Sequence, residues 1–249
     1  MNGVTNQVPR RIRSYVIRQG RVTPSQQKAL SELLPQFALN PATVFEPERQ
    51  FGRTAPVFLE VGFGNGETLA AMAAARPDHD FVGIEVHAPG IGHLLTAIRT
   101  RCLSNIRIYR GDAVEIMEQA IPDGSLDGIR IFFPDPWHKK KHQKRRLINS
   151  DFVRLAVAKL KPAGLLHAAT DWDDYAAQML SILSGCDQLV NCMPDGGFSP
   201  RPEERPLTKF ERRGIRLGHV VRDLRFRRVT ELPPDATIIP KATSAPLPE

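Results

Sequence analysis

A carboxylate, an aromatic ring and a dense group of cations lie within one short stretch of the chain, residues 131–146. Asp135 and Trp137 directly follow an apolar run that predicts a buried strand. Prolines fix φ and lack an N–H, so Pro134 and Pro136 must end that strand. Open α/β sheets place their sites at the carboxyl ends of strands. The stretch therefore predicts a site that includes Asp135 and Trp137.

Six of the eight residues from 139 to 146 are Lys or Arg, and no acid interrupts them. The whole chain of 249 residues carries a formal net charge of +7. Clustered positive charge favours a polyanionic partner. Beside a carboxylate and an aromatic ring, it indicates chemistry on a nucleic acid. A solvated surface is the alternative explanation for such a run.

A second motif is the glycine-rich turn 62–66, which lies between a predicted buried strand and a predicted helix. Its glycines permit tight turning and close approach of a ligand to the backbone, and the helix offers free N–H groups. Glu85 ends the next predicted strand, 19 residues after Gly66. An acid at this spacing accepts hydrogen bonds from ribose hydroxyls. A surface Glu at a strand end is the alternative.

Acids follow two further predicted strands. Asp112 follows the third strand, where it either caps the next helix or contacts a ligand. Asp171 follows the fifth strand, and His167 inside that strand is predicted to be a packed core residue rather than a catalytic one. With Glu85 and Asp135, the sequence thus places acids at four strand ends.

Strands and helices alternate along the chain, which predicts an α/β fold with a doubly wound, mostly parallel sheet and helices on both faces. Thr23 or Ser25 is expected to cap the first helix. The predicted strands are 57–62, 81–86, 106–109, 129–133, 165–170 and 220–229, and the predicted helices are 25–34, 67–75, 90–101, 150–161 and 175–183.

Length and composition set the domain organisation. With 41% hydrophobic residues, the chain can bury one full core. We expect a basic, partly flexible arm at 1–50, a folded domain at 51–232 and a disordered tail at 233–249. The three cysteines lack metal-ligand spacing, which indicates reduced thiols in the cytoplasm and no metal. Neither a signal peptide nor an apolar run long enough to span a membrane is evident.

Taken in order, these motifs resemble those of bacterial tRNA (guanine-N7-)-methyltransferases, over a stretch from Pro56 to Gly214. The motifs are Glu60–Gly66, Gly83–Glu85, Gly111–Ala113, Phe133–His142, Thr170–Asp171 and Thr208–Glu211. The resemblance implies a Rossmann-like class I methyltransferase domain that uses S-adenosyl-L-methionine. It also implies tRNA as the substrate, methylated at N7 of the variable-loop guanine, position 46.

The resemblance further implies roles for the residues at matching positions. Asp135 is the implied catalytic residue. Contacts with the cofactor are implied for Glu60, Gly62, Gly64, Glu85, Asp112 and Asp135. Contacts with the substrate guanosine are implied for Lys139, Asp171, Thr208, Lys209, Phe210 and Glu211. Contacts with the rest of the RNA are implied for Lys141, His142, Gln143, Lys144, Arg145 and Arg146.

The chemistry of guanine N7 limits what Asp135 must do. N7 already carries an in-plane lone pair, so no proton has to leave before it attacks a methyl group. Asp135 is therefore expected to orient the reactants and stabilise positive charge, not to act as an obligatory base. Asp171 or Glu211 suits the N1–H and N2–H groups of guanine. The exposed base would stack on Trp137 or Phe210, although Trp137 could instead be a partly buried anchor.

Other functions fit parts of the sequence. A dehydrogenase that binds NAD needs a third glycine where Glu67 stands, and it leaves the basic run unexplained. A non-catalytic RNA-binding protein has no need of acids at four strand ends. A methyltransferase acting on an exocyclic amine of another RNA also uses a Pro-rich tetrapeptide at this position. The sequence leaves the oligomeric state open between monomer and homodimer.

Overall fold

The computed structural model describes residues 12–16 and 20–230. Residues 1–11, 17–19 and 231–249 lie outside the described part, and with them the predicted tail and the beginning of the predicted arm.

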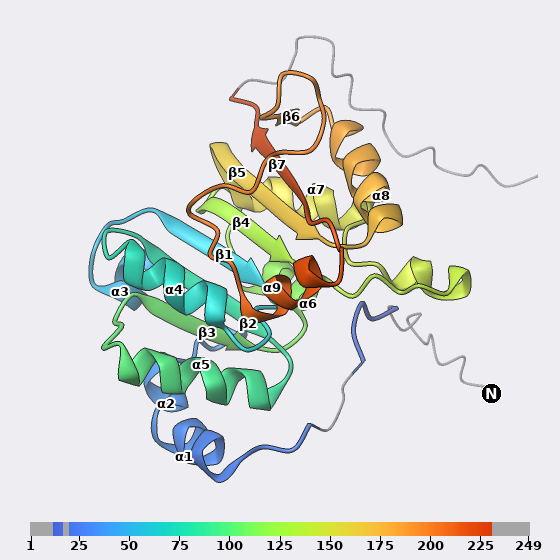
Figure 1. Cartoon of the computed structure of the whole chain (residues 1–249). Coiled ribbons are helices and arrows are strands. Elements are labelled where there is room, and N and C mark those ends of the chain that lie inside the picture. The colour runs from blue at the N-terminus through green and yellow to red at the C-terminus, as the bar shows by residue number, and fades with distance from the viewer. Residues whose placement is uncertain (1–11, 17–19, 231–249) are drawn as a thin grey trace, which may run out of the picture.

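A seven-stranded sheet in the order β3-β2-β1-β4-β5-β7-β6 forms the centre of the molecule (Figure 1). Strands β1 to β5 run parallel, while β7 is antiparallel to both β5 and β6. This topology confirms the predicted doubly wound, mostly parallel sheet. The strands are β1 (Val57–Val61), β2 (Asp80–Glu85), β3 (Ile106–Arg110), β4 (Leu126–Phe132), β5 (Leu160–Thr170), β6 (Leu189–Asn191) and β7 (Arg222–Arg228).

Helices cover both faces of the sheet, as the alternating pattern predicts. Helices α4 and α5 pack on one face with α1 outside them, and α6, α7 and α8 pack on the other. The helices are α1 (Pro24–Glu32), α2 (Leu34–Phe37), α3 (Pro47–Phe51), α4 (Glu67–Ala75), α5 (Ala88–Thr100), α6 (Ala113–Gln119), the 3₁₀ helix η1 (Lys140–Arg145), α7 (Ser150–Lys159), α8 (Asp173–Ser184) and α9 (Lys209–Arg216).

The boundary between α7 and β5 differs from the prediction. The helix ends at Lys159 and not at Lys161, and the strand begins at Leu160 and not at Leu165. Leu160 is fully buried and pairs with Leu126 of β4, so tertiary packing fixes this position. A shift in register follows on β4, and Ala163 takes a positive φ of 62°. The turn residues that suggested a loop here are thus accommodated inside an irregular strand.

The second half of the predicted arm is an integral part of the fold. Thr23 caps α1 in a capping box with Gln26, as predicted. Ala29 is fully buried in a cluster that includes residues of α5. The N–H of Leu39 donates to the carbonyl of Ile108 at 2.8 Å, and that of Phe45 to the carbonyl of Ala120 at 2.8 Å. This part of the chain therefore packs against the sheet and its helices.

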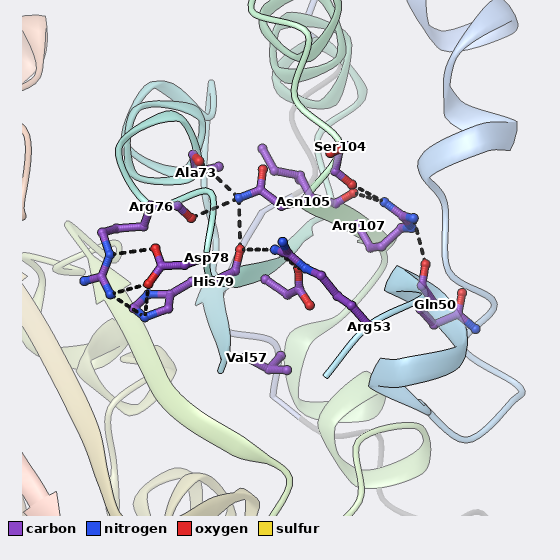
Figure 2. Close-up of polar contacts among 12 residues, drawn as sticks. Gln50, Arg53, Val57, Ala73, Arg76, Asp78, His79, Ser104, Asn105 and Arg107 are labelled. Atoms are coloured by element: carbon purple, nitrogen blue, oxygen red, sulfur yellow. Dashed lines mark hydrogen bonds and ion pairs between the residues drawn. The ribbon is translucent and has the colours of Figure 1, made fainter. Parts of the chain in front are cut away.

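The amino-terminal edge of the sheet is held by Asn105 (Figure 2). Its buried side-chain amide donates to the carbonyls of Ala73, Arg76 and His79 at 3.0, 3.2 and 2.9 Å. These carbonyls belong to the end of α4 and the turn that leads into β2, where helix carbonyls lack partners within the helix. One side chain thus fixes the connection that sets β2 beside β1 and β3.

We predict that Asn105→Ala lowers the free energy of unfolding by about 1–3 kcal/mol, because it leaves buried carbonyls without their donor. Urea denaturation measures this change. Ser104→Ala is the matched control, since this neighbour is exposed and its backbone carbonyl is the group that accepts from Arg107. Equal stability of the two variants would contradict the stabilising role of Asn105.

Candidate active site

Strand β4 ends in a strained backbone. Phe133 and Trp137 have positive φ values of 52° and 47°, in a backbone region that residues other than glycine rarely adopt. The N–H of Phe133 still donates to the carbonyl of Ala169 at 2.8 Å, which ties the turn to β5. Between the two strained positions, Asp135 is exposed at the carboxyl edge of the sheet. Strain of this kind persists where the surroundings over-determine the backbone, commonly at functional sites.

A cavity of about 210 Å³ opens beside Asp135 at the carboxyl ends of the first four strands. Three residues predicted to contact the cofactor line it, namely Gly62, Glu85 and Asp135. The remaining lining residues are Ser14, Tyr15, Val61, Ile84, Val86, His87, Gly111, Ala113, Phe132, Phe133, Pro134 and Leu147. The sheet thus brings together residues that lie far apart in the sequence.

Glu85 and the glycine turn form one wall of this cavity. The Glu85 carboxylate accepts hydrogen bonds from the N–H groups of Gly64 at 2.8 Å, Val86 at 2.7 Å and His87 at 3.0 Å. Gly62 and Gly64 have positive φ values, and a Cβ on either would meet no atom of the described residues within 4 Å. The wall is therefore bare backbone, which a nucleoside cofactor can approach closely.

Besides Gly64, two other predicted cofactor residues, Glu60 and Asp112, lie outside the cavity lining. Glu60 is buried beneath the turn, and one of its carboxylate oxygens has no hydrogen-bond partner among the described residues. Burial raises the pKa of Glu60 to about 8, although Arg130 beside it acts in the opposite direction. Asp112 caps α6 by accepting from the N–H groups of Val114 and Glu115. The capping alternative for Asp112 is thus confirmed.

The arm contributes to the site in a way that the sequence did not predict. Ser14 and Tyr15 line the cavity, and burial together with the negative charge of Asp112 raises the pKa of Tyr15. The indole N–H of Trp137 donates to the carbonyl of Ser14 at 3.0 Å. Neither spacing nor composition signals this placement, because the contact joins positions 123 residues apart. The bond supports the interpretation of Trp137 as an anchor.

A second cavity, of about 290 Å³, also borders Asp135. Its lining residues are Val16, Asp135, Pro136, Trp137, His138, Lys139 and His142. Asp135 is shared by the linings of the two cavities. Lys139, predicted to bind the guanosine, therefore lies beside the candidate catalytic carboxylate.

The end of β5 adjoins this second cavity. The Trp172 ring packs edge-on against the His138 ring, with centroids 4.2 Å apart. Its neighbour Asp171 is half-buried and lies 3.1 Å from Nδ1 of His219, which follows α9. Asp135 and Lys139 thus line this cavity, and Asp171 lies beside it at the end of β5.

The basic run divides into exposed and buried members. Lys139, Lys140, Lys141 and Lys144 are exposed, and the Arg145 guanidinium stacks on Trp137 at 4.9 Å from the ring centroid. Arg146 is buried and donates to the carbonyl of Pro136 at 2.9 Å, to Asp174 at 2.5 Å and to Gln178. Arg146 therefore holds η1 and the β4 turn on α8, and its own buried guanidinium is not exposed for contact with RNA.

The predicted guanosine residues 208–211 form the start of α9. Thr208 is the N-cap, and its hydroxyl accepts from the N–H of Glu211 at 3.1 Å. The Glu211 side chain is buried and pairs with Arg205. The side chains of Lys209 and Phe210 lie outside the described part of the structure.

Across 12–16 and 20–230, no group of three or more His, Cys, Asp or Glu side chains is arranged to hold a metal ion. Within the same ranges, every helix is too short or too polar to cross a membrane.

Residues 54–224 match a family model described as "Putative methyltransferase". The tRNA (guanine-N(7)-)-methyltransferase of Methylococcus capsulatus is 60% identical over 220 residues, which cover 88% of this chain and 95% of the relative. The enzyme of that name from Chromobacterium violaceum is 53% identical, covering 88% of this chain and 96% of the relative. The crystal structure of the 16S rRNA methyltransferase KamB shares the fold, with a TM-score of 0.50 and 15% identity over 76% of this chain and 99% of that one.

We predict that Glu60→Gln stabilises the protein more at pH 8 than at pH 5. The native carboxyl stays protonated up to about pH 8, while the unfolded one ionises near its ordinary pKa of 4.5. Unfolding therefore releases a proton between these values, and native stability falls as the pH rises. Glutamine removes this titration. Between pH 5 and pH 8, the free energy of unfolding of the variant should therefore rise relative to that of wild type by on the order of a few kcal/mol.

Urea denaturation at pH 5, 6.5 and 8 tests this prediction, with Glu32→Gln as the control at an exposed acid of α1. A stability difference between Glu60→Gln and wild type that stays constant with pH would show that Glu60 ionises normally in the native state.

Proposed function

The chain belongs to the tRNA (guanine-N(7)-)-methyltransferase family, and we propose that it transfers a methyl group from S-adenosyl-L-methionine to N7 of the variable-loop guanine, position 46, in tRNA. The methyl donor, the position of the guanine and the residue roles go beyond membership of the family. The geometry of the site supports the donor and the residue roles.

The observation that carries the proposal is that Asp135 belongs to the linings of two cavities. A methyl transfer needs a donor on one side of the reacting line and an acceptor on the other, held in line. The cavity lined by the glycine turn suits the nucleoside of the donor, and the cavity lined by Trp137 and Lys139 suits the base. Asp135 is a carboxylate common to both.

The reaction requires the protein to hold the two reactants in position and to stabilise the positive charge that develops on guanine. When bound, S-adenosyl-L-methionine supplies a methyl group on a sulfonium, whose bonding electrons return to sulfur as the bond from N7 to the methyl carbon forms. Guanine becomes cationic, and Asp135 stabilises that charge from a fixed position. Because N7 has no proton to lose, Asp135 needs no change of protonation during transfer. Glu85 would hold the ribose while it fixes the glycine turn.

Recognition of the guanine edge falls to Asp171 rather than Glu211. Both oxygens of Glu211 accept hydrogen bonds from Arg205, and the side chain is buried. Asp171 is half-buried, and its partner His219 is itself exposed, so the carboxylate can change partners at small cost. We therefore assign the N1–H and N2–H contacts to Asp171, and phosphate contacts to the exposed lysines of the basic run.

The remaining parts of the chain stay predictions. We propose that the enzyme works in the cytoplasm, where reduced thiols suit its unpaired cysteines Cys102, Cys186 and Cys192. The division into an arm (1–50), a methyltransferase domain (51–232) and a tail (233–249) also stays a prediction. The contacts of Ser14 and Tyr15 lead us to propose that the arm closes the cofactor cavity.

We predict that the purified chain, with labelled S-adenosyl-L-methionine and unmodified tRNA, produces N7-methylguanosine at position 46. Digestion of the product and identification of the labelled nucleoside measure it. Asp135→Ala should abolish transfer, and Asp135→Asn should lower kcat about 10²-fold, since one fixed charge is removed. A methylated exocyclic amine in the digest would move the function to that alternative.

Two controls accompany this measurement. Both variants should keep measurable binding of S-adenosylhomocysteine, weakened only by the loss of the one contact from Asp135, which shows that the rest of the first cavity is intact. The pH–rate profile of wild type should lack a limb set by a single carboxyl. A rate that depends on one deprotonation near the pKa of an ordinary Asp would make Asp135 an obligatory base instead of a fixed charge.

We predict that Lys140→Ala, Lys141→Ala and Lys144→Ala together weaken tRNA binding and flatten its dependence on salt. Each phosphate contact that the substitutions remove should reduce the slope of log K against log salt by about 0.7–0.9. Filter binding between about 50 and 300 mM salt measures the slope. A triple variant at Lys28, Arg49 and Arg154, cations on α1, α3 and α7, is the matched control and should keep the slope of wild type. Equal slopes for all three proteins would place the RNA elsewhere.

A further inference from the structure

Arg205 has the largest fully buried side chain among the described residues, although arginine is rarely buried without a partner. It lies on the segment between β6 and α9, which crosses one face of the sheet (Figure 1). Its guanidinium donates to both oxygens of Glu211 at 2.7 Å, and to both oxygens of Asp223 at 2.8 and 3.0 Å. One cation thus joins α9 to β7 through two bidentate pairs.

The pairs are closed to solvent on both sides. The side chains of Arg205, Glu211 and Asp223 are each 1% exposed. Asp223 also lies 2.7 Å from Nε2 of His167 on β5. Burial lowers the pKa of His167, so Arg205 is the charge that offsets the two carboxylates. Without its guanidinium, the buried carboxylate of Glu211 would lose the cation that pairs with both its oxygens, and Asp223 would keep His167 but no cation, which is strongly unfavourable.

The same guanidinium reaches the end of β4. Its central carbon lies 5.8 Å from the ring centroids of both Phe132 and Phe133, the residues that lead into the turn carrying Asp135. At the other end of α9, His219 pairs with Asp171 at the end of β5. Arg205 therefore contacts the end of β4 directly, and it is linked to the end of β5 only through α9 and His219.

The sequence of α9 suggests a different partner for Glu211. Thr208 and Glu211 have the spacing of a capping box, in which the acid turns back to the N–H of the N-cap residue. Here the hydroxyl of Thr208 caps the helix while the carboxylate of Glu211 points to Arg205. A guanine base could draw Glu211 away only by leaving a buried cation short of one partner.

We infer that Arg205 is a positioning residue for the base site, and that Glu211 acts through it as the anchor of α9 rather than by touching guanine. The inference rests on the proposed function, because it concerns the site of the accepted base. Arg205 fixes α9 on the sheet and supports the β4 turn, so that Asp171 and Asp135 face the second cavity in register.

The test compares Arg205→Lys, Glu211→Gln and the double variant in the full chain. Lysine keeps the charge but lacks the planar fork that holds two carboxylates. We expect each single variant to lower kcat/KM for tRNA by about 10- to 100-fold, the cost of a small misplacement. The double variant should be no worse than the poorer single one, because both changes break one clamp. The dissociation constant of S-adenosylhomocysteine should stay at the value of wild type.

Hydrogen exchange of α9 provides a readout that does not depend on activity. The backbone amides of Lys209–Arg216 should exchange faster in Arg205→Lys and in Glu211→Gln, while those of β1 and β2 keep their rates. Arg53→Lys is the matched control, because Arg53 pairs with the buried carboxylate of Asp80 at the opposite edge of the sheet. This control should lower stability but keep kcat/KM and the exchange rates of α9.

Each other outcome has a definite meaning. If the losses in kcat/KM multiply in the double variant, Glu211 acts independently of Arg205 and the inference fails. Unchanged exchange of α9 in both single variants would also overturn it, and Glu211→Gln alone decides this point if Arg205→Lys does not fold. If wild type transfers no methyl group to tRNA, the proposed function fails, while the exchange rates still decide whether the clamp exists.

Discussion

The site depends on how β4 ends. Two residues, Phe133 and Trp137, hold a backbone conformation that costs on the order of 1 kcal/mol or more each. Three hydrogen bonds offset this cost: from Phe133 to β5, from Trp137 to Ser14 of the arm, and from Arg146 to the carbonyl of Pro136. The groups that hold the turn in these bonds lie in three different parts of the chain: β5, the arm and Arg146, which follows η1. The turn that exposes Asp135 is therefore a product of the whole fold, although its sequence is local.

Beside this turn, three neighbouring strands of the sheet carry basic side chains. On β4, β5 and β7, Arg130, His167 and Arg225 are neighbours in register across the sheet. Arg205 and its two acids complete this group, which is covered by the segment leading to α9. Buried charges add less to stability than an apolar core of similar volume would. These pairs instead fix the local geometry, because a charged pair is satisfied in one arrangement, whereas apolar side chains can pack in several.

Much of this architecture follows from local patterns in the sequence. Pro134 and Pro136 mark the end of β4, and glycines 62 to 66 mark the first turn, because such residues restrict or free the backbone wherever they occur. The apolar setting of His167 correctly predicted a buried side chain. Strand order, and with it the gathering of acids at one edge, follows from the general rules of α/β folds.

Other features depend on contacts between distant positions, which no local pattern reveals. In the sequence, Arg146 cannot be told apart from the other cations of its run. In the structure its guanidinium is buried and hydrogen-bonds to Asp174 and Gln178 of α8. The end of α7 is set by pairing between Leu160 and Leu126, not by the proline that follows. The resemblance implied a guanosine contact for Glu211, but the structure joins its carboxylate to Arg205. Both tryptophans of the chain, Trp137 and Trp172, stand at the two strand ends beside the second cavity. The intrinsic tryptophan fluorescence of this protein therefore originates entirely at the proposed reaction centre, and its emission should report the arrival of a base there without any added label.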